Sequence, residues 1–365
     1  MGSVLLVSTA PPPGGIGGRA LLSRLMRNAL AELFGSELVV LELDRKPLKS
    51  PLAVAAGFAG RIDGVDRKAL QEVLSVIRDG ARQVFIDGSN LGEVARKAKR
   101  SFPDVQVITF FHNVEARFFW GALRRSRTPR ALAVVLANYL AERKSVRHSD
   151  KLVCMSERDS ALLRRLYGRQ ATHLSPMAME DRLGTGNASP QLPQEKFALF
   201  VGGLFYANQA GITWFADHVA PHAQIRTYVV GHGFDQLKSR LERSGNLTVV
   251  GSVDSLADWY EQAHVVVAPI FDGSGMKTKV AEALMFGKRV LGTPEAFSGY
   301  EDVASRAGEV CRTAPEFVSA LDQSAREPYL RMDPALRALY EQNYSYAAAR
   351  TRLKQIMTPA ASSAS

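Results

Sequence analysis

The chain has 365 residues, about twice the usual length of a single domain, so two domains are expected. Its composition, 46% hydrophobic, 8% aromatic and 22% charged, excludes a wholly disordered chain, a collagen-like repeat and a small disulfide-framed protein. The net charge of +10 is uneven: residues 1–175 hold 28 Lys and Arg against 16 Asp and Glu (+12), whereas residues 176–365 hold 18 against 20 (−2). The first half is therefore basic and the second half is near neutral.

The amino terminus is predicted to be a first strand. Residues 1–7 lack a basic segment and the chain turns polar at Ser8, which does not fit a signal peptide. The longest apolar stretch, residues 131–141, is too short for a helix that crosses a membrane. Cys154 and Cys311 fall one in each half, which suits two buried thiols in a reducing compartment. We therefore expect a cytoplasmic protein.

Short apolar runs rich in β-branched residues alternate with longer amphipathic segments, the pattern of parallel sheets covered by helices. In the first half the predicted strands are Val4–Ser8, Leu38–Leu43, Val84–Ile86, Val105–Phe110, Lys151–Met155 and Thr172–Leu174. In the second half they are Phe197–Val201, Thr227–Val230, Leu247–Val250, Val265–Ala268 and Arg289–Gly292. The segment from Pro334 to Met357 is predicted to be helical.

These elements predict an α/β protein with two Rossmann-like domains that face each other across a cleft, because such sheets bind ligands at the carboxyl ends of their strands. We expect an N-terminal domain at residues 1–176 and a C-terminal domain at 197–335. Residues 177–196, rich in Gly and Pro, are expected to be a linker. Residues 336–365 are expected to form a C-terminal helix and tail, with the helix packing back on the N-terminal domain.

A loop rich in glycine follows the first predicted strand. Gly15, Gly17 and Ala20 fit the fingerprint of a dinucleotide-binding turn, and Glu42 or Asp44 ends the second strand at a suitable distance. Three prolines precede the glycines, which is unusual for that turn, and any tight connection also uses glycine. A nucleotide-dependent oxidoreductase therefore stays open as an alternative.

A second loop, residues 269–277, leads into a predicted helix with lysines in its first turn. The free N–H groups at a helix N-terminus favour an anion, whereas Lys277 and Lys279 are poorly placed there unless an anion binds. Glu282 is one turn further along and could accept hydrogen bonds from a ribose diol. This pattern predicts a diphosphate site; the alternative is a solvated basic turn in which Glu282 pairs with Lys279.

Several motifs of the second half, in order along the chain, resemble the family-four glycosyltransferases of the GT-B fold, of the kind found in bacterial polysaccharide biosynthesis. In the first half, Phe111–Glu115 resembles the acceptor-side histidine segment of that family. The matching residues of the second half are Phe200–Leu204, Gly251–Leu256, Ala263–Pro269, Gly273–Gly275, Lys279, Glu282–Ala283, Gly287 and Val290–Thr293.

The resemblance implies a hexosyltransferase that uses a nucleotide diphosphate sugar, keeps the anomeric configuration, and needs no metal or other cofactor. Its acceptor would be a saccharide or a polyprenyl-diphosphate-linked saccharide in the synthesis of exopolysaccharide, capsule or lipopolysaccharide. Three residues are carried over as catalytic: His112, Lys279 and Glu282. The implied donor-binding residues are Gly15, Gly17, Gly203, Ser274, Gly275, Met276, Lys277, Thr278, Lys279 and Glu282.

The sequence departs from the family pattern near the donor. Ser274 stands where the first glutamate of the E-x7-E motif is expected, and Gly203 stands where many members have an arginine. Glu282 corresponds to the second glutamate, which the resemblance assigns to the ribose. Lys277 and Lys279 are the substitutes that we expect for the missing diphosphate contacts.

The first half also combines aromatic and basic residues after its fourth predicted strand. The expected acceptor or membrane face comprises Asn113, Glu115, Trp120, Arg124 and Arg125. Aromatic rings with a cationic fringe suit an anionic membrane surface, so peripheral docking on the inner face of the plasma membrane is one interpretation. The other is that the aromatics are core and the charges are solvated. No nucleic-acid-binding motif is present, so nucleic acid is not an expected partner.

Two further alternatives stay open. A sugar-nucleotide epimerase shares the GT-B architecture and needs no acceptor. A non-catalytic binding or scaffold protein would tolerate the loss of Lys277, Lys279 and Glu282 without loss of function.

Overall fold

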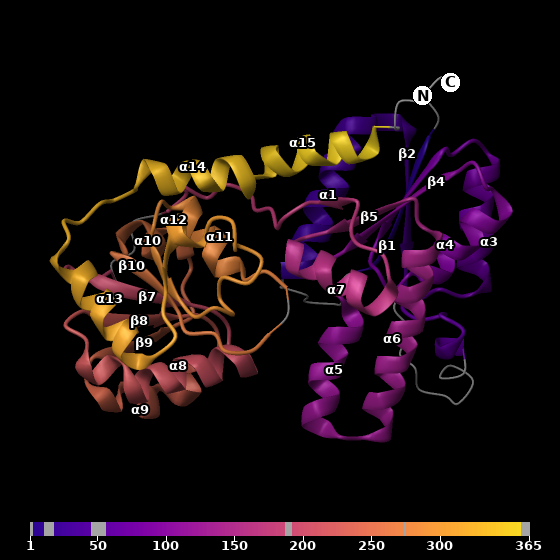
Figure 1. The fold of residues 1–365 in the computed structure, drawn as a ribbon. Coiled ribbons are helices and arrows are strands. Elements are labelled where there is room, and N and C mark those ends of the chain that lie inside the picture. Colours follow the sequence, from indigo (N-terminus) through magenta and orange to yellow (C-terminus); the bar gives the residue numbers. More distant parts are fainter. Residues whose placement is uncertain (1–2, 11–17, 45–55, 187–191, 274, 359–365) are drawn as a thin grey trace. The chain divides into compact units, whose positions relative to one another are not determined.

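The computed structural model describes residues 3–10, 18–44, 56–186, 192–273 and 275–358 (Figure 1). The chain divides into two compact units. The first comprises residues 1–176 together with 349–365, and the second comprises residues 177–348. Each unit is built on one parallel β-sheet of six strands, as the sequence predicted for an α/β protein.

The first sheet has the strand order β2-β1-β3-β4-β5-β6, and every pairing is parallel. The order reverses between β1 and β3, and such a switch point is where open α/β sheets bind their ligands, at the carboxyl ends of the strands. The strands are β1 (Val4–Thr9), β2 (Leu38–Leu43), β3 (Gln83–Asp87), β4 (Gln106–Phe111), β5 (Lys151–Cys154) and β6 (His173–Leu174).

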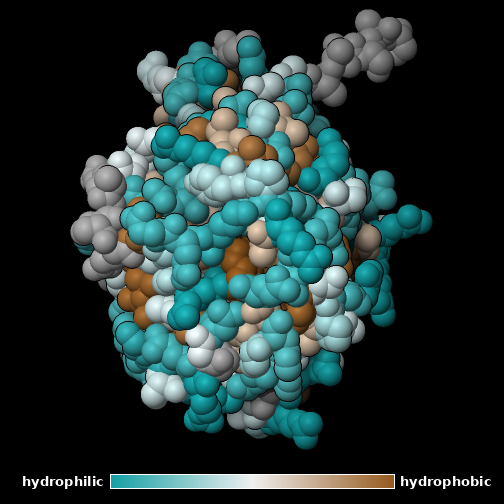
Figure 2. Space-filling model, turned by 90° about the vertical axis from the view of Figure 1, so that its left-hand side faces the viewer, coloured by the Kyte–Doolittle hydropathy of each residue, from teal (hydrophilic) through white to brown (hydrophobic). Residues whose placement is uncertain are grey.

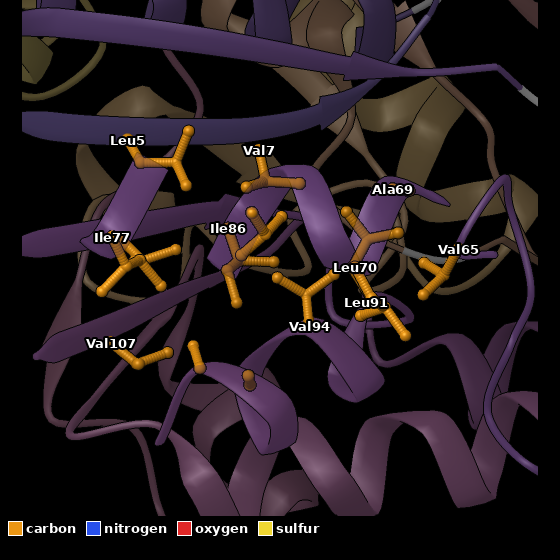
Figure 3. Packing of buried hydrophobic residues seen from close by; sticks show 14 of the residues in the cluster. Leu5, Val7, Val65, Ala69, Leu70, Ile77, Ile86, Leu91, Val94 and Val107 are labelled. Atoms are coloured by element: carbon orange, nitrogen blue, oxygen red, sulfur yellow. The ribbon is translucent and has the colours of Figure 1, made fainter. Parts of the chain in front are cut away.

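Helices cover this sheet and bury its apolar side chains. Figure 3 shows Leu5 and Val7 of the sheet beside Leu70 and Ile77 of α3 and Val94 of α4. Full burial of one such side chain contributes about 1.5–3 kcal/mol. The helices of this unit are α1 (Gly18–Phe34), η1 (Gly35–Glu37), α3 (Arg67–Arg78), α4 (Gly92–Ser101), α5 (Glu115–Ser126), α6 (Pro129–His148), α7 (Glu157–Tyr167) and α15 (Tyr346–Met357).

Helix α15 packs on the first unit although it comes last in the chain. Gln83 Nε2 donates a hydrogen bond to the carbonyl of Met357 (2.6 Å), and Lys151 Nζ donates to the carbonyl of Thr358 (2.8 Å). A lysine at the C-terminus of a helix satisfies carbonyls that have no partner inside the helix. Arg350 pairs with Glu32 of α1. Residues at the amino-terminal ends of β3 and β5 thus contact residues far away in the sequence.

The second sheet has the order β12-β11-β10-β7-β8-β9 and is also parallel. Counted from β7, this is the order 3-2-1-4-5-6 of dinucleotide-binding folds, with the switch point between β7 and β10. The strands are β7 (Phe197–Val201), β8 (Arg226–Val230), β9 (Leu247–Gly251), β10 (Val265–Ala268), β11 (Val290–Gly292) and β12 (Gly308–Val310).

Strand β12 was not predicted from the sequence, because Gly308, Glu309 and Val310 do not form an apolar run. It lies at the edge of the sheet, next to β11 only. The helices of the second unit are α8 (Tyr206–His218), η2 (Ala220–His222), η3 (Phe234–Leu237), α9 (Lys238–Leu241), η4 (Glu242–Ser244), α10 (Leu256–Gln262), α11 (Thr278–Met285), α12 (Ala304–Ala307), α13 (Ala314–Arg326) and α14 (Pro334–Asn343).

Residues 177–186, expected in a linker, belong to the second unit instead. The backbone N–H of Met179 donates to the carbonyl of Tyr344 (2.8 Å), and the N–H of Arg182 donates to the sulfur of Met285 (3.2 Å). The predicted tail helix is also two helices: α14 ends at Asn343 and α15 begins at Tyr346.

Candidate active site

The N-terminus of α11 lies just beyond the carboxyl end of β10, at the switch point of the second sheet. Lys277 is the N-cap residue, and its side chain caps none of the helix N–H groups. A helix end of this kind presents backbone N–H donors and a positive dipole to an anion. Gly275 before it has φ of +67°, a left-handed conformation that glycine adopts without strain. We call this helix end, together with Lys279 and Glu282, the candidate donor site.

Lys277 is less available for an anionic ligand than the sequence suggested. Its Nζ lies 2.9 Å from Glu295 Oε1 and also donates to the carbonyl of Gly275 (2.8 Å). Glu295 follows β11, the neighbour of β10, so the carboxyl ends of two adjacent strands bring these charges together. Glu295 was missed because the pairing depends on strand order, which the sequence motifs do not give.

Lys279 is buried, with only 6% of its surface exposed. Its Nζ donates to Asn208 Oδ1 (2.9 Å) and lies 4.2 Å from the centre of the Phe200 ring. Burial lowers the pKa of Lys279 to about 7, although the negative charge of Glu282 opposes this shift. Among the described residues, no carboxylate lies within ion-pair distance of this ammonium group.

Glu282 is half-buried and is held by Tyr260, whose hydroxyl donates to Oε2 (2.9 Å). Burial raises the pKa of the Glu282 carboxyl, against the hydrogen bond from Tyr260 and the positive charges of Arg182 and Lys279. The solvated ion pair with Lys279 that the alternative interpretation required is not formed, because the Lys279 ammonium binds Asn208. The carboxylate is therefore fixed in orientation.

The remaining donor-side predictions fall in different environments. The carbonyl of Gly203, after β7, accepts a hydrogen bond from Asn208 Nδ2 (2.9 Å). Asn208, which the sequence analysis missed, thus joins the β7 loop to Lys279. Met276 is buried and its sulfur accepts from the N–H of Met177 (3.4 Å), so it packs inside the unit. Thr278 is the first residue of α11. Gly15, Gly17 and Ser274 lie outside the described residues.

In the first unit, His112 directly follows β4 and is buried. Its Nε2 lies 2.6 Å from Oδ1 of Asp87, the last residue of the neighbouring strand β3. Burial acts to raise the pKa of Asp87, but the charge and the hydrogen bond of His112, helped by Ser23 and Arg19, hold it below its usual value. Asp87 was missed from the sequence because only the pairing of β3 with β4 places it beside His112.

Glu115 and Asn113 do not lie on an open face. Glu115 is the first residue of α5, is 4% exposed, and pairs with Arg19 Nη1 at 3.0 Å. Asn113 is half-buried. Glu115 was expected on an acceptor or membrane face; its burial and its ion pair with Arg19 do not fit a membrane-facing surface, and its place near an acceptor stays a prediction.

A buried carboxylate that the sequence analysis did not single out joins α5 to α6. Glu142 accepts four hydrogen bonds: from the N–H groups of Glu115 (2.8 Å) and Ala116 (2.9 Å) and from the hydroxyls of Ser89 (2.8 Å) and Tyr167 (2.8 Å). Burial raises the pKa of Glu142 to about 7. Its position at the N-terminus of α5 fixes where that helix begins.

Helices α5 and α6 lie side by side as an antiparallel pair (Figure 1). Phe110 and Phe111 are fully buried, as the core interpretation predicted, whereas Phe118 (40%) and Trp120 (48%) are exposed. Arg124 is exposed, and the side chain of Arg125 lies outside the described part. The aromatics thus divide into a core group and an exposed group.

Within the described ranges, no helix is long and apolar enough to cross a membrane. The face drawn in Figure 2 is mainly hydrophilic, with small separate hydrophobic patches. No group of three His, Cys, Asp or Glu in the same ranges is arranged to hold a metal ion.

Comparison with known proteins agrees with this architecture. Residues 195–326 match the model of the family described as glycosyl transferases group 1. A search of curated protein sequences gives no match. The solved structures that resemble the chain share little sequence with it, so they establish its fold alone.

Three of these structures span nearly the whole chain. HepE of Anabaena, in complex with UDP, has a TM-score of 0.65 at 12% identity and covers 97% of this chain and 99% of its own. Sucrose-phosphate synthase of Thermosynechococcus elongatus has a TM-score of 0.67 at 17% identity, covering 96% and 98%. WaaG, a glycosyltransferase involved in lipopolysaccharide biosynthesis, has a TM-score of 0.64 at 15% identity, covering 98% and 100%.

The GT-B fold expected from the sequence motifs is thereby confirmed. Two parallel six-stranded sheets, the structural likeness over nearly the full length and the family match in the second unit agree with one another. The chain has the GT-B fold, and its residues 195–326 match the glycosyl transferases group 1 family, which supports a glycosyltransferase.

Proposed function

We propose that the second unit binds a nucleotide diphosphate sugar and that the enzyme transfers the sugar, with retention of configuration and without a metal, to a saccharide acceptor. The observation that carries this proposal is Lys279, a buried ammonium group at the N-terminus of α11 with no carboxylate at ion-pair distance in the described part of the chain. An anionic ligand supplies the charge that this group lacks.

We assign the following roles to the residues of the candidate donor site. As the bond between the sugar and the diphosphate breaks, negative charge grows on the leaving phosphate. The N–H groups of α11 and the Lys279 ammonium stabilise that charge. Glu282, oriented by Tyr260, accepts hydrogen bonds from the ribose hydroxyls. His112, in the first unit, contacts the acceptor.

The proposed donor and acceptor have parallels among similar structures. HepE was crystallised with UDP and with UDP-glucose. WaaB, another similar structure, is a lipopolysaccharide outer core galactosyltransferase, with a TM-score of 0.62 at 12% identity. We propose a saccharide acceptor, carried on a polyprenyl diphosphate, in the synthesis of bacterial exopolysaccharide, capsule or lipopolysaccharide.

The exposed part of the α5–α6 pair supports an anionic membrane surface as a further partner. Phe118, Trp120, Leu132 and Leu136 are exposed there. Both glutamates of these helices, Glu115 and Glu142, are buried, so the described exposed charges are all arginines. Each surface arginine near an anionic membrane contributes about 1 kcal/mol. These exposed arginines are Arg117, Arg124, Arg130, Arg143 and Arg147.

A thermal-shift screen against UDP, GDP, ADP, dTDP and NAD tests the proposed donor. A nucleotide at a hundredfold excess over its Kd stabilises the native state by about 2.7 kcal/mol. We expect one nucleoside diphosphate to raise the Tm of the wild type and to lose this effect in Lys279→Ala and Glu282→Ala. Lys238→Ala, which removes an exposed lysine of the same unit, is the control and should keep the shift.

The same screen separates the alternatives. A shift with NAD alone contradicts the donor assignment and favours an oxidoreductase that uses the loop of Gly15 and Gly17. Stabilisation by a nucleoside diphosphate that survives in both variants contradicts the roles given to Lys279 and Glu282. The epimerase alternative needs a separate activity assay: release of an altered sugar nucleotide without any acceptor would favour it.

A further inference from the structure

Tyr300 contacts the first turn of α11, although it lies outside the motifs that predicted the candidate donor site. It belongs to the segment 293–303, which follows β11. The side chain is fully buried. Its hydroxyl lies 2.8 Å from the carbonyl oxygen of Lys277, the N-cap residue of α11. A side chain from another segment thus contacts the helix end at which we expect the diphosphate.

The hydroxyl of Tyr300 is the donor in this contact. Burial raises the pKa of Tyr300 well above its usual value, so the hydroxyl keeps its proton at neutral pH. A carbonyl oxygen only accepts, and it has two lone pairs. The carbonyl of Lys277 also accepts from the N–H of Val280, at 3.1 Å. Two donors, one from the helix and one from Tyr300, therefore hold this carbonyl in one direction.

The direction of the Lys277 carbonyl determines the direction of the first N–H group of α11. The peptide bond between Lys277 and Thr278 is planar and trans, so its C=O and its N–H point in opposite directions. The carbonyl points along the helix, and the N–H of Thr278 points out of its N-terminal end. The hydrogen bond from Tyr300 thus limits rotation of this peptide and keeps the N–H of Thr278 directed at an anion that binds there.

Tyr300 is itself held in place by the core of the second unit. Its ring packs against the ring of Tyr344, with 5.1 Å between their centres and both side chains buried. The N–H of Thr293, at the start of the same segment, donates to the carbonyl of Ala268 at the end of β10 (3.2 Å). The N–H of Val303 donates to the carbonyl of Tyr300 (3.0 Å). The hydroxyl is therefore in position before a ligand binds, and no free energy is lost in ordering it.

We propose that Tyr300 is a positioning residue for the donor: its hydroxyl orients the peptide between Lys277 and Thr278 so that the N–H of Thr278 donates to the diphosphate. Lys277 then contributes through its backbone carbonyl, because its ammonium group is paired with Glu295. This inference rests on the proposed binding of a nucleotide diphosphate sugar. It adds a residue that acts through the backbone of α11 rather than by contact with the ligand.

Calorimetric titration with the nucleoside diphosphate that stabilises the wild type tests this role. Tyr300→Phe keeps the ring and removes only the hydroxyl, and we expect the affinity to fall about tenfold. The matched control is Tyr340→Phe. Tyr340 is also buried in the second unit, and its hydroxyl also donates to a backbone carbonyl, that of Met179 (2.9 Å). The control should bind with wild-type affinity, and equal affinity of Tyr300→Phe and wild type would overturn the proposal.

Binding of the corresponding nucleoside separates positioning from a general effect on the fold. The nucleoside has no phosphate, so Tyr300→Phe should bind it as tightly as the wild type does. An equal loss of affinity for the nucleoside and for the nucleoside diphosphate would contradict the positioning role, because damage to the fold weakens the binding of both ligands.

NMR on protein labelled with ¹⁵N at its threonines observes the peptide directly, and Thr278→Ser identifies the amide signal of Thr278. In the wild type, the nucleoside diphosphate should move this signal to lower field, because the N–H donates to phosphate. Without ligand, Tyr300→Phe should also shift the signal, whereas Tyr340→Phe should leave it unchanged. If a saturating nucleoside diphosphate leaves the wild-type signal unchanged, the proposal is overturned, even if Tyr300→Phe does not fold.

This proposal and the proposed function fail in different ways. If no nucleoside diphosphate binds the wild type, the proposed donor is contradicted, and the role of Tyr300 with it. If one binds the wild type and is lost in Lys279→Ala, but binds Tyr300→Phe with unchanged affinity, only the role of Tyr300 is contradicted.

Discussion

Glu142 in the first unit and Lys279 in the second are buried charged groups without an opposite charge at ion-pair distance in the described structure. The two groups differ in how much of their hydrogen-bonding capacity is used. Glu142 accepts four, which uses both carboxylate oxygens twice. Lys279 donates one, to Asn208, although an ammonium group has three donors. Glu142, whose acceptors are all used, stabilises the fold. Lys279, which has unused donors, is where we expect a ligand.

The comparison also shows that net charge along the sequence does not predict the charge of a site. In the basic first half, the buried His112 contacts the carboxylate of Asp87. The near-neutral second half places Lys279 at its switch point. Most of the basic excess of the first half lies on exposed helix surfaces instead, such as α5 and α6.

Removal of the Glu142 carboxylate should have the largest effect. Glu142→Ala leaves four buried donors without an acceptor, and we expect a loss of about 3–5 kcal/mol of unfolding free energy. Urea denaturation measures it, with Glu37→Ala, a partly exposed glutamate of the same unit, as the control. A loss below 1 kcal/mol would contradict the structural role of this group.

Glu142 also predicts a pH dependence of stability. Its folded pKa of about 7 lies above the unfolded value of 4.5, so the folded state binds its proton more tightly. The contribution of this group is therefore fully present below pH 4.5 and is lost as the pH rises through 7, by about 3 kcal/mol. Urea denaturation of wild type and Glu142→Gln between pH 4.5 and 7.5 checks this, because the glutamine variant should lack this component.

The next largest effect is expected on nucleoside diphosphate affinity when Lys279 is replaced, whereas replacement of Lys277 should have a small effect. Lys279→Met removes the ammonium whose donors are unfilled, and we expect nucleoside diphosphate affinity to fall about 100-fold. Lys277→Met removes a charge that Glu295 already neutralises, and we expect a loss of less than about fivefold. Isothermal titration calorimetry measures the affinity of both variants. A larger loss of affinity in Lys277→Met than in Lys279→Met would contradict the role given to the unused donors of Lys279.

Nucleotide affinity should also depend on pH. Because the pKa of Lys279 is about 7 without ligand, its charge is lost above that pH, and a diphosphate must then bind together with a proton. We expect affinity to fall about fivefold from pH 7 to pH 8, because the protonated fraction of Lys279 falls by that factor, and Lys279→Met to lack this dependence. Calorimetry in two buffers of different ionisation enthalpy reports the proton uptake directly.

The smallest effect is expected at the membrane surface. Arg124→Gln removes one exposed charge of α5, which should weaken binding to vesicles with anionic lipid about fivefold, or about 1 kcal/mol. Vesicle flotation measures it, and Arg78→Gln on α3 is the matched control. If the wild type does not float with anionic vesicles, the membrane partner is excluded.

The sequence was sufficient for the fold but not for the site. Strands such as β1 and β7 are apolar runs between turns, so their positions follow from local pattern. Asp87, Asn208 and Glu295 carry no local signal. Each acquires its role because strand order brings the carboxyl ends of distant strands together. Lys279 was recognised from the motif, but its burial and its single hydrogen bond appear only in three dimensions.

The first unit is made from two separated stretches of chain, with α15 completing it after the whole second unit has been made. During synthesis, domains generally fold as they emerge, the N-terminal one first. Gln83 and Lys151 can donate their hydrogen bonds to Met357 and Thr358 only after α15 has been synthesised. The unit whose synthesis begins first is therefore the last to be completed. The fold of the first unit can therefore be completed only after the whole second unit has been synthesised.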